Sequence, residues 1–202
     1  MFNYDAIVNN IKEIKEKHII ELKKTTNSVP KSFWETYSSF SNTKGGLIIL
    51  GVEEGIEENV VTGVNNPEKI ISDLWNQLSN QNKVSYNSLN NDDIITRKLE
   101  YNKSIIIIKV SEVPWGKKPV YINNDITKSY IRTGDGDRLM KDDELKIIMG
   151  NSSPQMDSIL LENFSIEDLD PISVASFKEK VTSRYPNNGY ESLDPEEFLI
   201  EI

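Results

Sequence analysis

The side chains best placed for chemistry are Glu53 and Glu54, which follow a stretch of chain that should be buried. Residues Leu47–Leu50 form an uninterrupted apolar run, which is typical of a strand covered on both faces. The run stops at Gly51, and the two glutamates follow where the strand should emerge from its sheet. Ligand sites often lie at the carboxyl ends of strands in α/β sheets. The sequence therefore indicates either a ligand site at this edge or the acidic, solvated end of a core strand.

Several common kinds of site are excluded by composition. The chain has no cysteine, so it has neither a disulfide framework nor a thiolate metal site. His18 is its single histidine, which rules out a multi-histidine metal site, and we expect it on the surface or at a strand end. Neither the phosphate-binding pattern G-x-x-x-x-G-K-[ST] nor the dinucleotide-binding pattern G-x-G-x-x-G occurs.

A helix and a tight turn should position the two glutamates. The helix should begin at Pro30, which suits a first helical position, and its buried side carries an aromatic stripe formed by Phe33, Tyr37 and Phe40. Asn42 can end the helix. Gly45 and Gly46 should form the turn into the apolar strand, and at least one of them should have a positive φ.

The remaining pattern predicts an α/β fold of the α+β type, a mixed β-sheet flanked by helices. Helices are predicted over residues 5–16, after Asn66-Pro67 and over Lys141–Met149, and Asn80–Asn91 is expected to be an exposed loop. Strands are predicted over residues 18–24, 60–61, 93–100, 104–110, 119–122 and 129–133.

Charge and composition change near residue 150, which predicts two parts, residues 1–150 and residues 151–202. The first part holds 20 basic and 21 acidic side chains, whereas the second holds 3 basic and 11 acidic ones, so most of the net charge of −9 lies in the second part. The second part should be a short acidic extension with helices around Ser176 and after Asp194. The balanced first part leaves room for a local basic face that binds phosphates.

No apolar run approaches the ~20 residues that cross a bilayer. The first residues also lack the basic start and apolar middle of a signal peptide. We therefore expect a cytoplasmic protein without a membrane partner.

Three segments together resemble the Schlafen-type, Alba-like domain family of bacterial proteins described as DNA-binding transcriptional regulators. Glu16–Lys23 is similar to the opening motif E-[ST]-x-x-x-E-[FL]-K. Ser39–Gly46, running into Leu50–Glu54, resembles the central motif, and Lys118–Tyr121 with Tyr130–Gly134 resembles K-P-x-Y … Y-x-R-x-G. The resemblance covers roughly residues 10–150 and implies an α/β domain that contacts nucleic acid.

The resemblance also implies a three-carboxylate site that cuts structured RNA in vertebrate Schlafen proteins. By position this site falls on Glu16, Glu21 and Glu53, with Glu54 as the less favoured third member. Here the third residue is Glu rather than Asp, and Lys17 replaces a small polar residue. The bound metal would be Mg²⁺ or Mn²⁺, which suit oxygen ligands and can activate water. The alternative is three separate surface glutamates.

Glu16 and Glu21 can converge only if the chain bends between them. Five positions is an odd step along a strand, and in one helix it separates the side chains by roughly 140°. If three carboxylates did meet, they would repel one another unless protonated or bound to a cation. Replacing Glu21 with glutamine should then stabilise the metal-free protein.

The candidate nucleic-acid-binding residues combine cations with two tyrosines that could stack on unpaired bases. They are Lys23, Lys24, Lys44, Lys117, Lys118, Tyr121, Lys128, Tyr130 and Arg132. The alternative is ordinary solvated lysines and core tyrosines.

The preferred function is a nucleic-acid-binding domain of a bacterial transcriptional regulator, with DNA or RNA as its partner. A metal-dependent endoribonuclease is the first alternative, and an oligomerisation or interaction module, such as a homodimer, is the second.

Overall fold

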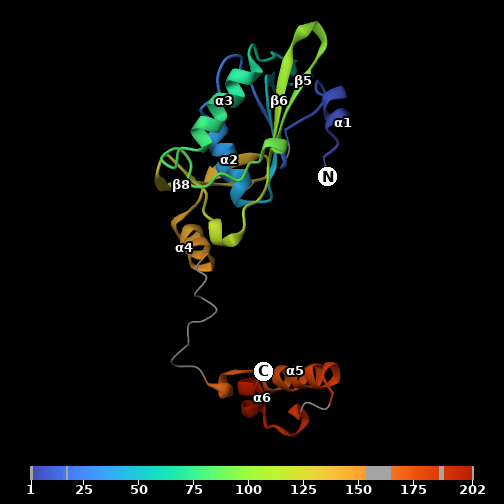
Figure 1. Ribbon diagram of the computed structural model, residues 1–202, viewed down its shortest axis with the longest axis vertical. Helices are drawn as coiled ribbons and strands as arrows, with labels where there is room; N and C mark the ends of the chain where they lie inside the picture. The colour runs from blue at the N-terminus through green and yellow to red at the C-terminus, as the bar shows by residue number, and fades with distance from the viewer. Residues whose placement is uncertain (1, 17, 153–164, 187–188, 202) are drawn as a thin grey trace. The chain divides into compact units, whose positions relative to one another are not determined.

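The computed structural model describes residues 2–16, 18–152, 165–186 and 189–201. The chain forms two compact units, Met1–Met156 and Asp157–Ile202 (Figure 1). The helices of the first unit are α1 (Tyr4–Asn9), α2 (Phe33–Asn42), α3 (Pro67–Leu78) and α4 (Asp142–Asn151). Its strands are β1 (Ile20–Lys23), β2 (Gly46–Leu50), β3 (Val52–Glu53), β4 (Val60–Val61), β5 (Ile94–Lys98), β6 (Ser104–Val110), β7 (Tyr121–Ile122), β8 (Asp125–Thr133) and β9 (Gly136–Leu139).

The core of the first unit is a mixed sheet with strand order β1-β2-β6-β5. Strand β1 runs parallel to β2, whereas the β2–β6 and β6–β5 pairs are antiparallel. Helix α2 connects the parallel strands, as such a connection requires. A second sheet has the order β7-β8-β9, and a small hairpin joins β3 to β4. This mixed arrangement confirms the predicted α+β class.

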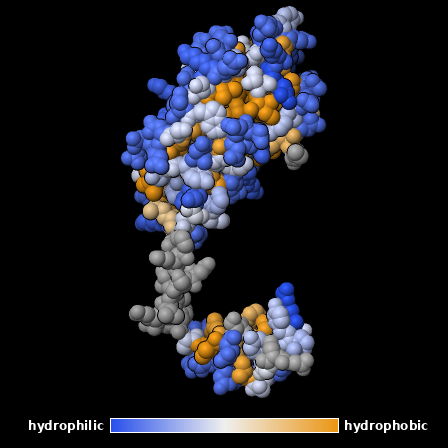
Figure 2. Space-filling view, viewed as in Figure 1, coloured by the Kyte–Doolittle hydropathy of each residue, from blue (hydrophilic) through white to orange (hydrophobic). Residues whose placement is uncertain are grey.

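Both faces of the central sheet are covered, which explains the uninterrupted apolar runs. Ile48 and Leu50 face the aromatic side of α2, together with Ile106 and Ile108 of the neighbouring strand. The alternate residues lie in the second core cluster with residues of α1, because successive side chains of a strand point to opposite faces. In Figure 1, α2 and α3 lie on one side of β5 and β6, and α1 lies on the other. Figure 2 shows apolar side chains gathered over these strands, within a largely hydrophilic surface.

Small polar side chains of α2 fasten the second sheet to the helix. The Asn42 side chain donates to the carbonyls of Val120 (2.8 Å) and Tyr130 (3.0 Å) and accepts from the Val120 N–H (2.7 Å). Ser38 donates to the same Val120 carbonyl at 2.6 Å and accepts from the Tyr130 N–H at 3.0 Å. These bonds satisfy the backbone of β8 and of the segment before β7 within the core. The motif residue Asn42 therefore holds two layers together, beyond ending its helix.

Several predicted boundaries are corrected by the structure. Helix α2 begins at Phe33 rather than Pro30, whose carbonyl accepts from the Phe33 N–H in a preceding turn. Helix α1 ends at Asn9, so most of the predicted 5–16 helix is absent. The loop at residues 80–91 buries Val84 and Leu89 and is therefore not simply exposed. Met149 was predicted to end its helix, but α4 continues to Asn151.

Other predicted elements are confirmed. Asn66 caps α3 by accepting from the Lys69 N–H at 3.0 Å, and Pro67 follows at the first helical position. Strand β4 returns along β3 as expected. None of the helices in the described ranges is long and apolar enough to cross a membrane.

The second unit contains α5 (Pro171–Arg184) and α6 (Pro195–Glu201), which confirms helices around Ser176 and after Asp194. Their contact is aromatic: Phe177 and Tyr190 each lie 5.9 Å from the fully buried Phe198, measured between ring centroids. The edge-on geometry is a favoured one for aromatic pairs. This unit thus has a small core of its own.

Alanine at Gly45 or Gly46 should destabilise the first unit, for two different reasons. Gly45 has a φ of +72°, and a Cβ there would lie 2.6 Å from the Val110 carbonyl oxygen. Gly46 has an ordinary φ, but its Cβ would lie 2.6 Å from the Phe40 ring. We expect each change to lower the free energy of unfolding in urea by about 1–3 kcal/mol.

Gly116 provides the control, because an added Cβ meets nothing within 4 Å. Phe40→Leu should partly rescue Gly46→Ala but not Gly45→Ala. Equal unfolding curves for all three alanine variants would show that the turn argument is wrong.

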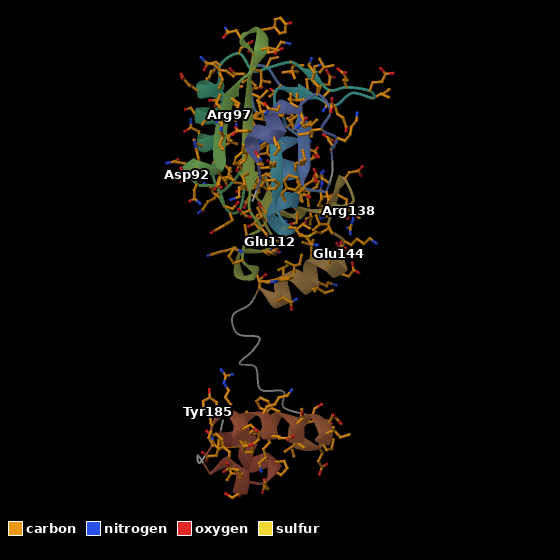
Figure 3. All side chains as sticks on the ribbon, turned by 90° about the vertical axis from the view of Figure 1, so that its right-hand side faces the viewer. Asp92, Arg97, Glu112, Arg138, Glu144 and Tyr185 are labelled. Atoms are coloured by element: carbon orange, nitrogen blue, oxygen red, sulfur yellow. The ribbon has the colours of Figure 1, made fainter. Side chains whose placement is uncertain are left out.

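The contact between β9 and α4 should weaken in acid. The Glu144 carboxylate accepts from both Arg138 guanidinium nitrogens, at 2.8 and 2.7 Å, and from the Lys141 N–H at 2.8 Å (Figure 3). The Arg138 hydrogen bond, followed by the Lys141 N–H, lowers the pKa of Glu144 from 4.5 to about 2. Because the pKa of Glu144 is lower in the folded protein than in the unfolded chain, the ionised carboxylate stabilises the fold at pH values above 4.5. That stabilisation is lost as the pH falls from 4.5 towards about 2.

Glu144→Gln should therefore lower the melting temperature at neutral pH, and the difference from wild type should shrink on acidification below about pH 4. Glu13→Gln is the control, because the described residues show no hydrogen bond or ion pair for that exposed carboxylate. A difference that does not depend on pH would contradict the assigned cause.

Candidate functional site

The chain bends between Glu16 and Glu21, as convergence of their side chains requires. Residues 18–19 form a turn before β1. The bend lets the Glu16 carboxylate fold back and accept from the Leu22 N–H at 2.9 Å. The Glu16 N–H in turn donates to the Glu54 carboxylate at 3.1 Å. Residues far apart in the sequence thus meet at the start of β1.

The acidic loop after β3 is fixed against this bend. The Lys15 ammonium donates to the carbonyls of Gly55 (2.8 Å) and Ile56 (3.0 Å). The Asn59 amide group is buried and donates to the carbonyls of Ile11 (2.9 Å) and Ile14. These bonds place Glu54 beside Glu16 without any ligand.

Burial and neighbouring charge disfavour the ionised form of Glu16. Burial raises the pKa of Glu16 most, and the negative charges of Glu21 and Glu54 raise it further. The Leu22 N–H opposes this shift by stabilising the carboxylate. Glu16, Glu21 and Glu54 are therefore electrostatic neighbours.

Glu21 is neutralised by protein cations. Its carboxylate pairs with the Arg132 guanidinium at 2.8 Å and also with Lys23. Arg132 also pairs with Asp137 at 2.9 Å, and its side chain is only 1% exposed. Burial alone would lower the pKa of Arg132, but the hydrogen bonds and charges of Asp137 and Glu21 raise it above its ordinary value.

The predicted set Glu16, Glu21 and Glu53 does not fit a metal. Glu53 pairs with Lys24 at 2.9 Å, and Glu54 takes the place beside Glu16. No group of three or more acidic or histidine side chains suited to a metal ion occurs among the described residues. Of the two glutamates considered as third member, Glu54 is the one that contacts Glu16, and no step through Mg²⁺ or Mn²⁺ follows from these positions.

Two of the cations predicted to contact nucleic acid are buried, so their charges do not face a ligand. Arg132 lies between Glu21 and Asp137, with the Phe40 ring 5.1 Å from its guanidinium carbon. The Lys118 side chain is 3% exposed and donates to the Asn42 carbonyl at 3.0 Å and to Glu112 at 2.6 Å. Both side chains stabilise the fold.

The other predicted cations divide by their partners. Lys23 pairs with Glu21, Lys24 with Glu53, and Lys128 with Asp125 at 3.5 Å. Lys44 and Lys117 are exposed and have no carboxylate partner in the described part of the chain. Of the predicted cations, only Lys44 and Lys117 are therefore fully available to an anion.

The two predicted tyrosines are half-buried. The Tyr121 N–H donates at 2.9 Å to the hydroxyl of Ser85, which lies in the loop of residues 80–91. The Tyr130 hydroxyl donates to Glu35 at 3.5 Å, and burial followed by the Glu35 charge raises the pKa of Tyr130. In the sequence, Tyr121 is four residues from Lys117 and Tyr130 is thirteen.

Two lysines that sequence reasoning missed, Lys31 and Lys83, lie close enough for their charges to interact, and Lys117, which it did predict, contacts the same segment through Tyr86. We define the lysine row as Lys31, Lys83 and Lys117. The Lys83 ammonium lies 5.0 Å from the centre of the Trp34 ring, and the Lys117 ammonium lies 5.6 Å from that of Tyr86. Burial lowers the pKa of Lys83, and the positive charge of Lys31 lowers it further.

The lysine row depends on pairing that no periodic pattern signals. Val84 bridges to Ile122, and the Ser85 N–H donates to the Tyr121 carbonyl at 3.0 Å. The Tyr37 hydroxyl donates to the Tyr86 carbonyl at 3.2 Å, which ties the same segment to α2. In the sequence, the lysine row could have been suspected only from the presence of Lys83 and Tyr86 in the polar stretch Asn80–Asn91.

His18 lies at a strand end, as expected. It is exposed, and its Nδ1 lies 3.0 Å from the Gly134 carbonyl oxygen. The ring therefore links the turn before β1 to the turn between β8 and β9.

Comparison with known proteins gives matches to two families. The family described as Schlafen, AlbA_2 matches residues 16–141. A domain of unknown function matches residues 146–202. No curated protein matches the chain.

Two solved structures resemble the chain. One is the N-terminal domain of a protein from Nitrosomonas europaea described as related to the ATP-dependent DNA helicase RecG. It is 21% identical with a TM-score of 0.49, over 70% of this chain and 97% of that one. The other is the DIP2311 protein from Corynebacterium diphtheriae, 13% identical with a TM-score of 0.49, over 96% of this chain and 35% of that one.

Glutamine at Glu16 and at Glu21 should have opposite effects on stability. Glu16→Gln keeps an acceptor for the Leu22 N–H but removes a repelled charge, so we expect a gain of about 0.5 kcal/mol at neutral pH. Glu21→Gln leaves the buried Arg132 with a weaker partner, so we expect a loss of about 2–4 kcal/mol. This second expectation replaces the stabilisation predicted from sequence.

The pH dependence provides the check. Because the pKa of Glu16 is higher in the folded protein than in the unfolded chain, its ionisation costs stability only at pH values above the unfolded pKa of 4.5. The gain from Glu16→Gln should therefore disappear at lower pH. Urea unfolding at several pH values measures both effects. A destabilised Glu16→Gln would contradict the electrostatic account.

Proposed function

Because the chain belongs to the Schlafen, AlbA_2 family, which indicates a nucleic-acid-related domain, we propose that its first unit binds nucleic acid in a cytoplasmic bacterial transcriptional regulator. The phosphates contact the lysine row. The unit that would do this carries nearly balanced charge, so the acidic total of the chain does not oppose a local basic face.

The observation that supports the proposal is geometric: Lys83 and Lys117 lie over the rings of Trp34 and Tyr86, and the charge of Lys31 acts on Lys83. Like charges held together are unfavourable in the free protein, and an anion placed between them relieves the repulsion. The described residues offer none of the three row lysines a carboxylate partner. By contrast, Lys118 and Arg132 are already neutralised inside the fold.

The alternatives have less support. A metal-dependent endoribonuclease lacks a matching donor set among the described residues. An interaction module without nucleic-acid binding would leave the uncompensated lysine row unexplained.

Neutralising the lysine row should weaken binding and flatten its salt dependence. The variant Lys31→Gln/Lys83→Gln/Lys117→Gln should reduce the slope of log K against log salt by about 2–3 units for duplex DNA, or about 2 for single strands. Fluorescence anisotropy with labelled DNA and RNA over a range of salt concentrations measures this slope.

The matched control is Lys12→Gln/Lys98→Gln/Lys146→Gln, which changes the net charge equally at exposed lysines outside the row. It should bind with nearly the wild-type slope. Equal slopes for the two triple variants would place the interface elsewhere, and a wild type that binds no nucleic acid at low salt would support the interaction module.

A further inference from the structure

Trp115 is a large aromatic side chain left at the surface beside the lysine row. It begins the single-turn 3-10 helix Trp115–Lys117 and is 53% exposed. Two backbone hydrogen bonds close the turn, from Lys117 N–H to the Pro114 carbonyl and from Lys118 N–H to the Trp115 carbonyl, both at 2.9 Å. The ring is thus exposed on a fixed turn.

The ring is supported from inside by a buried cation. The Lys118 ammonium lies 4.6 Å from the centre of the Trp115 ring, while it also binds the Asn42 carbonyl and Glu112. A cation over an indole face is attracted by the ring's quadrupole. One side of Trp115 is therefore anchored to the core, and its exposed half remains available to a planar ligand.

The groups around this exposed ring favour a nucleobase. Lys117, in the same turn, is exposed and lies over Tyr86, and it can contact a phosphate next to a stacked base. Glu112, three residues before Trp115, is paired with Lys118. Aromatic side chains between cations are the usual platform for single-stranded nucleic acid.

From these contacts we infer that Trp115 stacks on an unpaired base, so that the first unit prefers single-stranded DNA or RNA to a duplex. The inference rests on the proposed nucleic-acid binding and adds the class of ligand. In a duplex the base faces are covered by their neighbours, so the platform has no partner there. The lysine row holds the phosphates of the flanking nucleotides.

The test compares Trp115→Leu with Trp115→Phe, which differ in whether an aromatic face remains. The probes are a single-stranded oligodeoxyadenylate, an oligoadenylate RNA, and duplexes of each with its complement. Trp115→Leu should weaken single-strand binding by about 5- to 100-fold, whereas Trp115→Phe should retain most of the affinity. Duplex binding should change less than about twofold in both variants. The DNA and RNA arms show which sugar is preferred.

A second readout is the fluorescence of the protein. Single strands should quench wild-type emission more than that of Trp115→Phe, in which Trp34 and Trp75 remain. Melting temperatures in the absence of ligand establish that both variants are folded at the assay temperature.

Two results would overturn the stacking role. One is equal single-strand affinity for Trp115→Leu and wild type, and the other is an equal loss for single strands and duplexes. Wild type that binds no probe at low salt would instead refute the proposed function itself, together with this inference.

Discussion

The ion pairs of Arg132 are the interaction on which the first unit depends. A guanidinium with 1% exposure is costly to bury unless carboxylates surround it, and Glu21 of β1 and Asp137 of β9 supply them. Asp137 accepts from Thr36 of α2 at 2.6 Å, and the Arg132 N–H donates to Thr43 at 3.0 Å. One buried cation thereby connects the central sheet, the second sheet and the helix between them.

This network changes the meaning of the charged motif residues. A glutamate from the opening motif and an arginine from the third motif resemble, in sequence, a catalytic acid and a phosphate contact. In the fold they neutralise each other, so neither has its full charge available to a ligand. Lys118 of the third motif is also paired, with Glu112. Lys31, Lys83 and Lys117, which have no carboxylate partner among the described residues, lie outside the three motifs.

The sequence predicted the parts of the fold that local chemistry determines. Uninterrupted apolar runs identified β2 and β6, Asn66-Pro67 identified the start of α3, and the glycine pair identified the turn with its positive φ at Gly45. The candidate site could not be predicted in the same way, because it depends on contacts between distant segments. Whether Glu53 or Glu54 lies against Glu16 is decided by how Lys15 and Asn59 hold the acidic loop. The spacing of residues along the chain does not predict those hydrogen bonds.

The positions of the uncompensated charges constrain any anionic ligand more tightly than the net charge does. Phosphates are repelled from the start of β1, where Glu16 and Glu54 adjoin and the pKa of Glu16 is already raised. In the function we propose they contact the lysine row, where burial, and then the positive charge of Lys31, lower the pKa of Lys83. Since Lys117 lies in the turn that carries Trp115, a strand bound to the lysine row as we propose would reach the exposed indole. Under this proposal the charges at these two places would direct the nucleic-acid backbone, and the aromatic ring would determine which kind of strand binds.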